Sequence, residues 1–176
     1  MSGSEGAGRP LVVLIGPPGA GKTTIGELLA QALGVGFHDT DAAIEAAQGR
    51  SIADIFVSDG EPYFRDLERA EVLRALESHP GVLALGGGAP IETAVGEALG
   101  EHRVVFLDVG IADAAKRVGF ATSRPLLMVN PRQQWTAMMG RRRPVYESLA
   151  AFRVNTAGRE PQEIVDEILA LLEAPQ

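Results

Sequence analysis

The sequence predicts a three-layer α/β domain, in which helices cover both faces of a parallel sheet. Short and almost wholly apolar runs, such as LVVLI at residues 11–15, are typical of strands that are buried on both faces. Segments with helical spacing alternate with these runs along the chain. A glycine-rich stretch separates the first apolar run from the first helical segment, and this is the usual context of a phosphate-binding loop.

Length and composition fit one globular domain. The chain has 176 residues, and we expect a single domain over residues 11–176 after a flexible tail over residues 1–10. The net charge of −7 argues against nucleic-acid binding, and the lack of cysteine excludes disulfides and thiolate metal sites. No apolar run is long enough to span a bilayer, and the first residues lack the order of a signal peptide. We therefore expect a cytoplasmic protein that does not contact a membrane.

The first part of the chain alternates strands and helices. A helix over residues 23–33 follows the first strand, because its apolar side chains form one stripe and Gly34 can end it. Residues 37–39 form a short second strand, after which Thr40 is expected to cap a helix over residues 41–48.

The next elements are defined by a cap and by a run of glycines. Ser51 and Asp54 have the spacing of a capping arrangement, which predicts a helix over residues 52–58. Residues 61–78 form a long amphipathic helix, and VLAL at residues 82–85 is a third buried strand that three glycines close. A short helix over residues 93–99 follows.

The last part of the chain contains two more strands. Residues 104–108 (VVFLD) form the fourth strand, and a helix over residues 111–118 follows it. Residues 119–132 show no clear periodicity and are long for a structureless connection, so we interpret them as a lid or binding loop. The remaining expected elements are two helices, the fifth strand and a closing helix, at residues 133–139, 144–151, 152–155 and 161–172.

The stretch GPPGAGKT has the spacing of a phosphate-binding loop. Gly16, Gly19 and Gly21 permit positive φ angles and let several N–H groups converge. The following helix N-terminus favours an anion, Lys22 supplies a charge for the β- and γ-phosphates, and Thr23 supplies a hydroxyl for Mg²⁺. A chance glycine-rich turn is the alternative, but the buried strand before it and the amphipathic helix after it favour nucleotide binding.

Two acidic pairs are candidates for acceptor chemistry. Asp39 and Asp41 follow the second strand, where ligands bind in open α/β sheets, and one carboxylate could serve Mg²⁺ while the other serves an acceptor hydroxyl. A helix cap and a solvated side chain are an equally good interpretation. Arg65 and Glu68 lie three residues apart on a helix, which by spacing alone favours a surface ion pair over an anion-binding arginine.

Glycines and arginines later in the chain suggest close contact with a ligand. Three successive glycines after residues 82–85 exceed the needs of a turn, and they would let the backbone pass close to a ligand. The arginines at 124 and 141–143 could be solvated, could complement a helix C-terminus, or could meet phosphates or substrate. The sequence alone leaves these three interpretations open.

Taken together, these motifs resemble those of the shikimate kinase family from residue 11 to about residue 172. The matching stretches are GPPGAGKTT, FHDTDAAIE, GRSIADIF, DGEPYFRDLE, LALGGGA, RPLL and RRRPVYESLA. The resemblance implies a P-loop kinase fold with a five-stranded parallel sheet in the order 2-3-1-4-5 and a lid at about residues 119–132. It implies that ATP, with Mg²⁺, phosphorylates the 3-hydroxyl of shikimate in the pathway to chorismate and the aromatic amino acids, and we expect a monomer.

The resemblance also implies roles for individual residues. Asp41 would hold the acceptor hydroxyl and act as base, and Glu68 would orient Arg65. The transferring phosphate would meet Lys22 and Arg124, and Mg²⁺ would be held by Thr23 and Asp39. Shikimate would be bound by Asp41, Arg65, Gly86, Gly87, Gly88 and Arg142. The nucleotide would be bound by Gly19, Ala20, Gly21, Lys22, Thr23, Thr24, Arg117, Arg124 and Arg159.

The sequence leaves two other functions possible. A gluconate kinase or a nucleoside monophosphate kinase would share the phosphate loop and the lid, but it has no evident need for F-R-x-x-E together with G-G-G-A. A nucleotide switch without acceptor chemistry is the second alternative. A GTPase would be expected to carry N-K-x-D, which is absent from the sequence.

Overall fold

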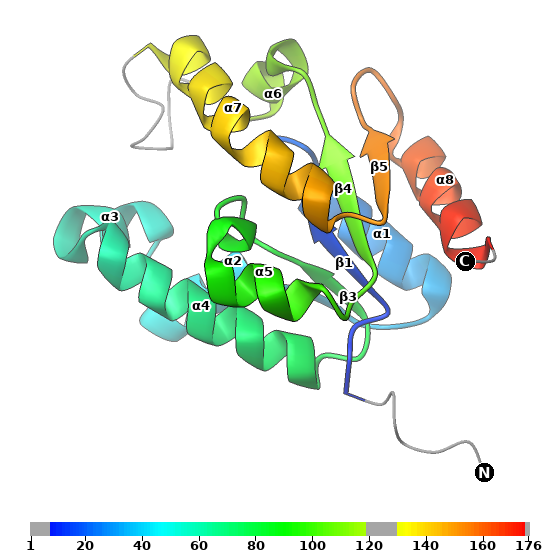
Figure 1. Cartoon of the computed structure of the whole chain (residues 1–176), viewed down its shortest axis with the longest axis horizontal. Helices are drawn as coiled ribbons and strands as arrows, with labels where there is room; N and C mark the ends of the chain where they lie inside the picture. The colour runs from blue at the N-terminus through cyan, green and yellow to red at the C-terminus, as the bar shows by residue number, and fades with distance from the viewer. Residues whose placement is uncertain (1–7, 119–129, 175–176) are drawn as a thin grey trace.

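The described part of the chain forms a three-layer α/β structure. A computed structural model describes residues 8–118 and 130–174. Five strands form one parallel sheet in the order β2-β3-β1-β4-β5, which confirms the predicted fold and strand order (Figure 1). The strands are β1 (Val12–Ile15), β2 (Phe37–Asp39), β3 (Val82–Ala84), β4 (Val104–Asp108) and β5 (Phe152–Asn155).

Helices cover both faces of this sheet. α1 and α8 contact each other on one face, while α4, α5 and α7 cover the other (Figure 1). The helical segments are α1 (Lys22–Leu33), α2 (Thr40–Gln48), α3 (Ile52–Asp59), α4 (Glu61–Ser78), the 3₁₀ turn η2 (Ala89–Ile91), α5 (Thr93–Leu99), α6 (Ile111–Val118), α7 (Pro131–Leu149) and α8 (Pro161–Glu173). Among the described residues, no helix has the length and apolarity needed to cross a membrane.

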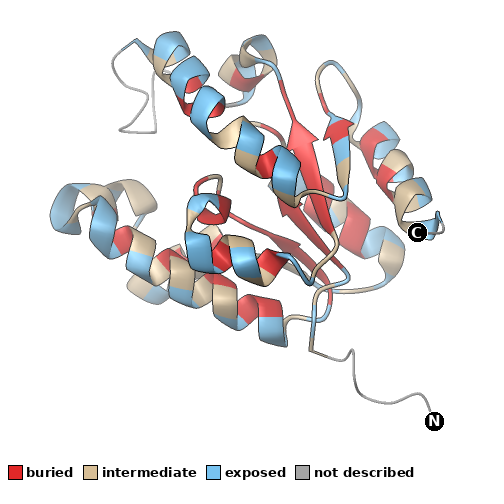
Figure 2. Ribbon diagram, viewed as in Figure 1, coloured by how far each residue is buried: buried red, intermediate tan, exposed pale blue. Residues whose placement is uncertain are grey.

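The core lies between the sheet and the two helical layers. Every residue of β1, β3 and β4 is buried, because these central strands are covered on both faces (Figure 2). The edge strand β5 alternates between exposed and buried side chains instead. The apolar runs of the sequence therefore identified the central strands, which hold the ends of the functional loops in fixed positions.

The cap of α2 differs from the prediction. Asp39, and not Thr40, caps this helix, because its carboxylate accepts hydrogen bonds from the N–H groups of Asp41 and Ala42. Thr40 is fully buried, and its hydroxyl accepts a hydrogen bond of 3.4 Å from the N–H of Gly86. The predicted cap of α3 is present, since Ser51 accepts from the N–H of Asp54.

The two helices predicted at residues 133–139 and 144–151 are one continuous helix. Pro144 lies inside α7 and cannot donate the backbone hydrogen bond to the carbonyl of Gly140. Gly140 is exposed, so water can reach this carbonyl and the helix continues through the proline. The helix begins at Pro131, which places the last two residues of the expected lid in α7.

Candidate active site

The glycine-rich loop after β1 curls back over the start of α1. Gly19 and Gly21 have positive φ angles of 85° and 91°, and a Cβ atom at Gly16 would collide with the carbonyl oxygen of Leu107. The Lys22 ammonium group donates to the carbonyl oxygens of Gly16 (2.8 Å) and Pro17 (3.0 Å). The loop thus places a cation and a helix N-terminus around one point, an arrangement that suits phosphate groups.

Two side chains with oxygen groups, those of Thr23 and Asp39, lie next to this loop. The Thr23 hydroxyl donates to Oδ2 of Asp39 over 2.8 Å, while Oδ1 of Asp39 caps α2. Asp39 therefore provides the helix cap that was one of the two interpretations, and its other oxygen faces Thr23, while its role toward Mg²⁺ stays a prediction. A hydroxyl and a carboxylate beside a phosphate loop fit Mg²⁺, which usually keeps several water ligands and binds through one or two protein groups.

The three glycines after β3 each face a different functional group. A Cβ atom at Gly86 would lie 2.9 Å from Cγ of Asp41, and one at Gly87 would lie 3.1 Å from Nη1 of Arg142. A Cβ atom at Gly88 would overlap the guanidinium group of Arg65. Side chains at these positions would displace Asp41, Arg142 and Arg65. This explains why the segment has glycine at all three positions, which a plain turn would not need.

Gly87 also touches the phosphate-binding loop. A Cβ atom there would lie 3.2 Å from Cδ of Pro18 and 3.4 Å from the carbonyl oxygen of Gly16. The three glycines 86–88, hereafter the glycine strap, therefore lie next to the phosphate loop and to the Asp41, Arg65 and Arg142 side chains, with no room for side chains of their own. The two predicted parts of the site are neighbours.

Arg65 and Glu68 form an ion pair, but not on the surface. Nη1 of Arg65 lies 2.7 Å from Oε1 of Glu68, whose side chain is 1% exposed. Burial raises the pKa of Glu68, and the nearby charge of Arg65 partly offsets this rise. Burial lowers the pKa of Arg65, but the charges of Glu68 and Glu61 outweigh this and raise it overall. The preference for a surface pair, based on spacing, was wrong, and Glu68 holds Arg65 from the protein interior.

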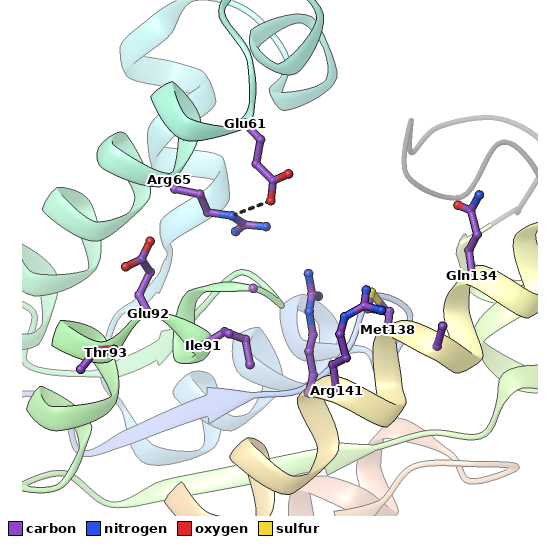
Figure 3. Close-up of a pocket in the computed structure, with 11 residues that line it drawn as sticks. Glu61, Arg65, Ile91, Glu92, Thr93, Gln134, Met138 and Arg141 are labelled. Atoms are coloured by element: carbon purple, nitrogen blue, oxygen red, sulfur yellow. Dashed lines mark hydrogen bonds and ion pairs between the residues drawn. The ribbon is translucent and has the colours of Figure 1, made fainter.

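A cavity of about 890 Å³ opens beside Arg65 and the glycine strap. Figure 3 shows Glu61 and Arg65 of α4 on one side of it and Gln134, Met138 and Arg141 of α7 on the other. Its lining residues are Glu61, Arg65, Gly88, Ile91, Glu92, Thr93, Gln134, Ala137, Met138, Arg141 and Arg142. Cationic groups thus face the cavity from two helices, as an anionic ligand would require.

The structure separates the three arginines at positions 141–143. Arg141 and Arg142 line the cavity, whereas Arg143 turns away and binds Oδ2 of Asp108 over 2.6 Å. Arg153 binds the same oxygen over 2.7 Å. Burial would raise the pKa of Asp108, but the hydrogen bonds and charges of these two arginines hold it below its ordinary value. Arg143 therefore anchors α7 to β4 beside Arg142.

The other residues that are predicted to bind the nucleotide lie in different surroundings. Arg117 donates to the carbonyl oxygen of Gly19 (2.9 Å) and to that of Thr156 (3.0 Å), so it joins the phosphate loop to the end of β5. Arg159 donates to the carbonyl oxygen of Asn155 and pairs with Glu167 at 3.2 Å. Thr24 is exposed in the first turn of α1, while Ala20 is buried in the loop. Arg124, like residues 119–129 of the expected lid, lies outside the described residues.

Sequence reasoning missed several residues of this site. Tyr146 is fully buried and donates a hydrogen bond of 2.6 Å to the carbonyl oxygen of Gly87. Glu61 lines the cavity and lies 3.4 Å from Nε of Arg65. A signal existed for Tyr146, because it lies four residues after Arg142 and hence on the same face of the helix. The sequence carried no sign of its partner.

Known proteins match the chain over most of its length. The family model described as "Shikimate kinase" matches residues 18–173. A shikimate kinase of Thermobifida fusca is 54% identical, covering 94% of this chain and 96% of its own, and one of Streptomyces coelicolor is 50% identical, covering 93% and 96%. The solved structure titled "Shikimate kinase from Acinetobacter baumannii in complex with shikimate" superposes with a TM-score of 0.89, at 35% identity over 93% of both chains.

Proposed function

Because this chain belongs to the shikimate kinase family, it transfers a phosphate from ATP to the 3-hydroxyl of shikimate, and we propose that the residues around the glycine strap divide this work. One observation supports the assignment most strongly. A Cβ atom at Gly87 would meet Pro18 and Gly16 of the phosphate loop as well as Arg142, so Gly87 lies between these groups. A nucleotide on the loop and an acid held by the arginines would therefore meet at the strap.

The phosphate loop holds the triphosphate of ATP. Backbone groups of residues 19–24 and the N-terminus of α1 surround the phosphates, and Lys22 neutralises the charge that spreads over the transferring group. Thr23 and Asp39 would hold Mg²⁺, and the ion would neutralise further charge on the phosphate oxygens. Arg117 and Arg159 lie around the adenine, and the family resemblance implies a contact with the same phosphate for Arg124, which is outside the described residues.

The acceptor pocket holds shikimate at two ends. Arg65 and Arg142 bind its carboxylate, since planar guanidinium groups can engage both oxygens, and Glu68 fixes Arg65 from behind. Asp41 accepts a hydrogen bond from the 3-hydroxyl, and the strap supplies backbone groups beside it. The ring is thereby oriented with one hydroxyl toward the phosphate loop.

The chemical step follows from this orientation. The 3-hydroxyl oxygen bonds to the γ-phosphorus as the bond to the β-phosphate oxygen breaks, and ADP leaves with the electron pair. The hydroxyl proton passes to Asp41, whose main contribution is to aim the hydroxyl. In a loose transition state, alignment and charge neutralisation supply most of the rate enhancement.

We further expect the protein to act as a cytoplasmic monomer without nucleic-acid or membrane partners. Its net charge of −7 would repel phosphate backbones and anionic lipid surfaces. Light scattering of the purified protein at several concentrations tests the monomer, and a dimer mass throughout would contradict it.

A coupled assay for ADP tests the function directly. We expect ADP release with ATP, Mg²⁺ and shikimate, equal amounts of shikimate 3-phosphate by mass spectrometry, and little release with gluconate or AMP. Faster turnover of gluconate or AMP than of shikimate would contradict the proposed acceptor.

A further inference from the structure

A buried tyrosine of α7 supports the glycine strap through its hydroxyl group. Tyr146 is 0% exposed, and its hydroxyl donates to the carbonyl oxygen of Gly87 over 2.6 Å. Its ring packs against that of Phe106 of β4, with a centroid separation of 5.1 Å. The hydroxyl group thus reaches the strap from a well-fixed ring.

The hydrogen bond fixes more than one atom of the strap. The carbonyl of Gly87 and the N–H of Gly88 belong to the same planar peptide unit, in which they point in opposite directions. Glycines rotate easily, so an unsupported strap of three glycines would sample several peptide orientations. By holding the carbonyl of Gly87, Tyr146 also sets the direction of the N–H of Gly88, a residue that lines the cavity.

Tyr146 also lies beside Arg142. The two residues are four apart on α7 and therefore share one helix face. Burial raises the pKa of Tyr146, while the charge of Arg142 and its hydrogen bond to the phenol oppose this rise. The hydroxyl that donates to the carbonyl of Gly87 thus lies near the Arg142 guanidinium, whose Nη1 would be 3.1 Å from a Cβ atom at Gly87.

We propose that Tyr146 is a positioning residue of the acceptor site, whose hydroxyl between the Gly87 carbonyl and the Arg142 guanidinium holds both in the orientation that receives shikimate. This inference rests on the proposed roles of Gly87 and Arg142. It adds that these two groups are positioned by one hydroxyl, and that losing it impairs shikimate binding without removing any group that touches the substrate.

The substitution Tyr146→Phe tests this role, because it removes only the hydroxyl. We expect KM for shikimate to rise about fivefold, as for the loss of one buried hydrogen bond, with KM for ATP unchanged. Tyr63→Phe is the matched control, since Tyr63 is 41% exposed, and it should leave both values unchanged. If the role of Tyr146 were purely structural, Tyr146→Phe would lower the melting temperature without raising KM for shikimate more than KM for ATP. Equal KM values for shikimate in Tyr146→Phe and in the wild type would overturn the proposal.

A second measurement does not require Tyr146→Phe to fold. The chain has two tyrosines, so Tyr63→Phe protein labelled with 3-fluorotyrosine gives one ¹⁹F signal, from residue 146. Titration with shikimate should shift this signal, whereas ATP without shikimate should shift it far less. A ¹⁹F signal whose position does not change on addition of shikimate would overturn the inference. If the wild type does not phosphorylate shikimate at all, the proposed function itself has failed, which is a distinguishable result.

Discussion

Replacing Gly88 by alanine tests whether the glycine strap is shaped by Arg65. Gly88 has a φ angle of −90°, which alanine adopts without strain, so any effect comes from the added methyl group. This Cβ atom would overlap the Arg65 guanidinium and lie 2.8 Å from its Cζ, whereas ordinary contacts begin at 3.4 Å. Cζ must therefore move by roughly 0.6 Å and the nearer Nη1 by about 1 Å, and a displacement of that size can cost about 100-fold in rate.

The assay measures initial rates of ADP release against shikimate and against ATP. In Gly88→Ala, kcat/KM for shikimate should fall by about 100-fold, while KM for ATP stays the same because the phosphate loop is not touched. Gly140→Ala is the control, since a Cβ atom there meets nothing within 4 Å. It should keep full activity and gain about 0.5–1 kcal/mol of stability, because alanine favours the helix. Unchanged shikimate kinetics in Gly88→Ala would refute the reasoning.

Three further substitutions test other parts of the site. Asp41→Asn should reduce turnover severely and leave ATP affinity, measured by calorimetry, nearly intact, because Asp41 lies against Gly86 rather than on the phosphate loop; normal turnover would exclude its proposed role. Thr23→Ala should raise the Mg²⁺ concentration needed for half-maximal rate, and Thr23→Ser should not, since serine keeps the hydroxyl that faces Asp39; equal Mg²⁺ curves for the two variants would count against this site. Asp108→Asn should lower the melting temperature at pH 7, because Arg143 and Arg153 hold the pKa of Asp108 below its ordinary value. That stabilisation is present above the unfolded pKa of about 4 and is lost as the pH falls through the lower pKa of the folded state, so the difference between the two proteins should shrink below about pH 4; a difference that stays constant as the pH is lowered would argue against the ion pairs.

Local patterns were enough to predict most of the framework. The apolar run at β1, the glycines after it and the stripe of α1 each involve neighbours in the chain, so spacing reveals them. The proline inside α7 misled the prediction, because the tolerance of Pro144 depends on the exposure of Gly140. The cap of α2 was misassigned for a similar reason, since Thr40 has a buried partner far along the chain.

The contacts within the site could not be predicted from spacing. Tyr146 and Gly87 are 59 residues apart, and Asp108 and Arg143 are 35 apart, so no local periodicity links them. The same holds for the burial of Glu68, which turns an apparent surface pair into an internal one. Residue types alone left the three arginines at 141–143 equivalent, whereas their directions on α7 separate them.

A crystal structure with shikimate, Mg²⁺ and a non-hydrolysable ATP analogue is the most direct measurement of how the two ligands meet. The carboxylate of shikimate should lie on Arg65 and Arg142, and its 3-hydroxyl should lie beside Asp41 and about 3–3.5 Å from the γ-phosphorus. If shikimate binds with its carboxylate away from both arginines, or with the 3-hydroxyl facing away from the phosphate loop, the proposed division of work around the glycine strap is wrong.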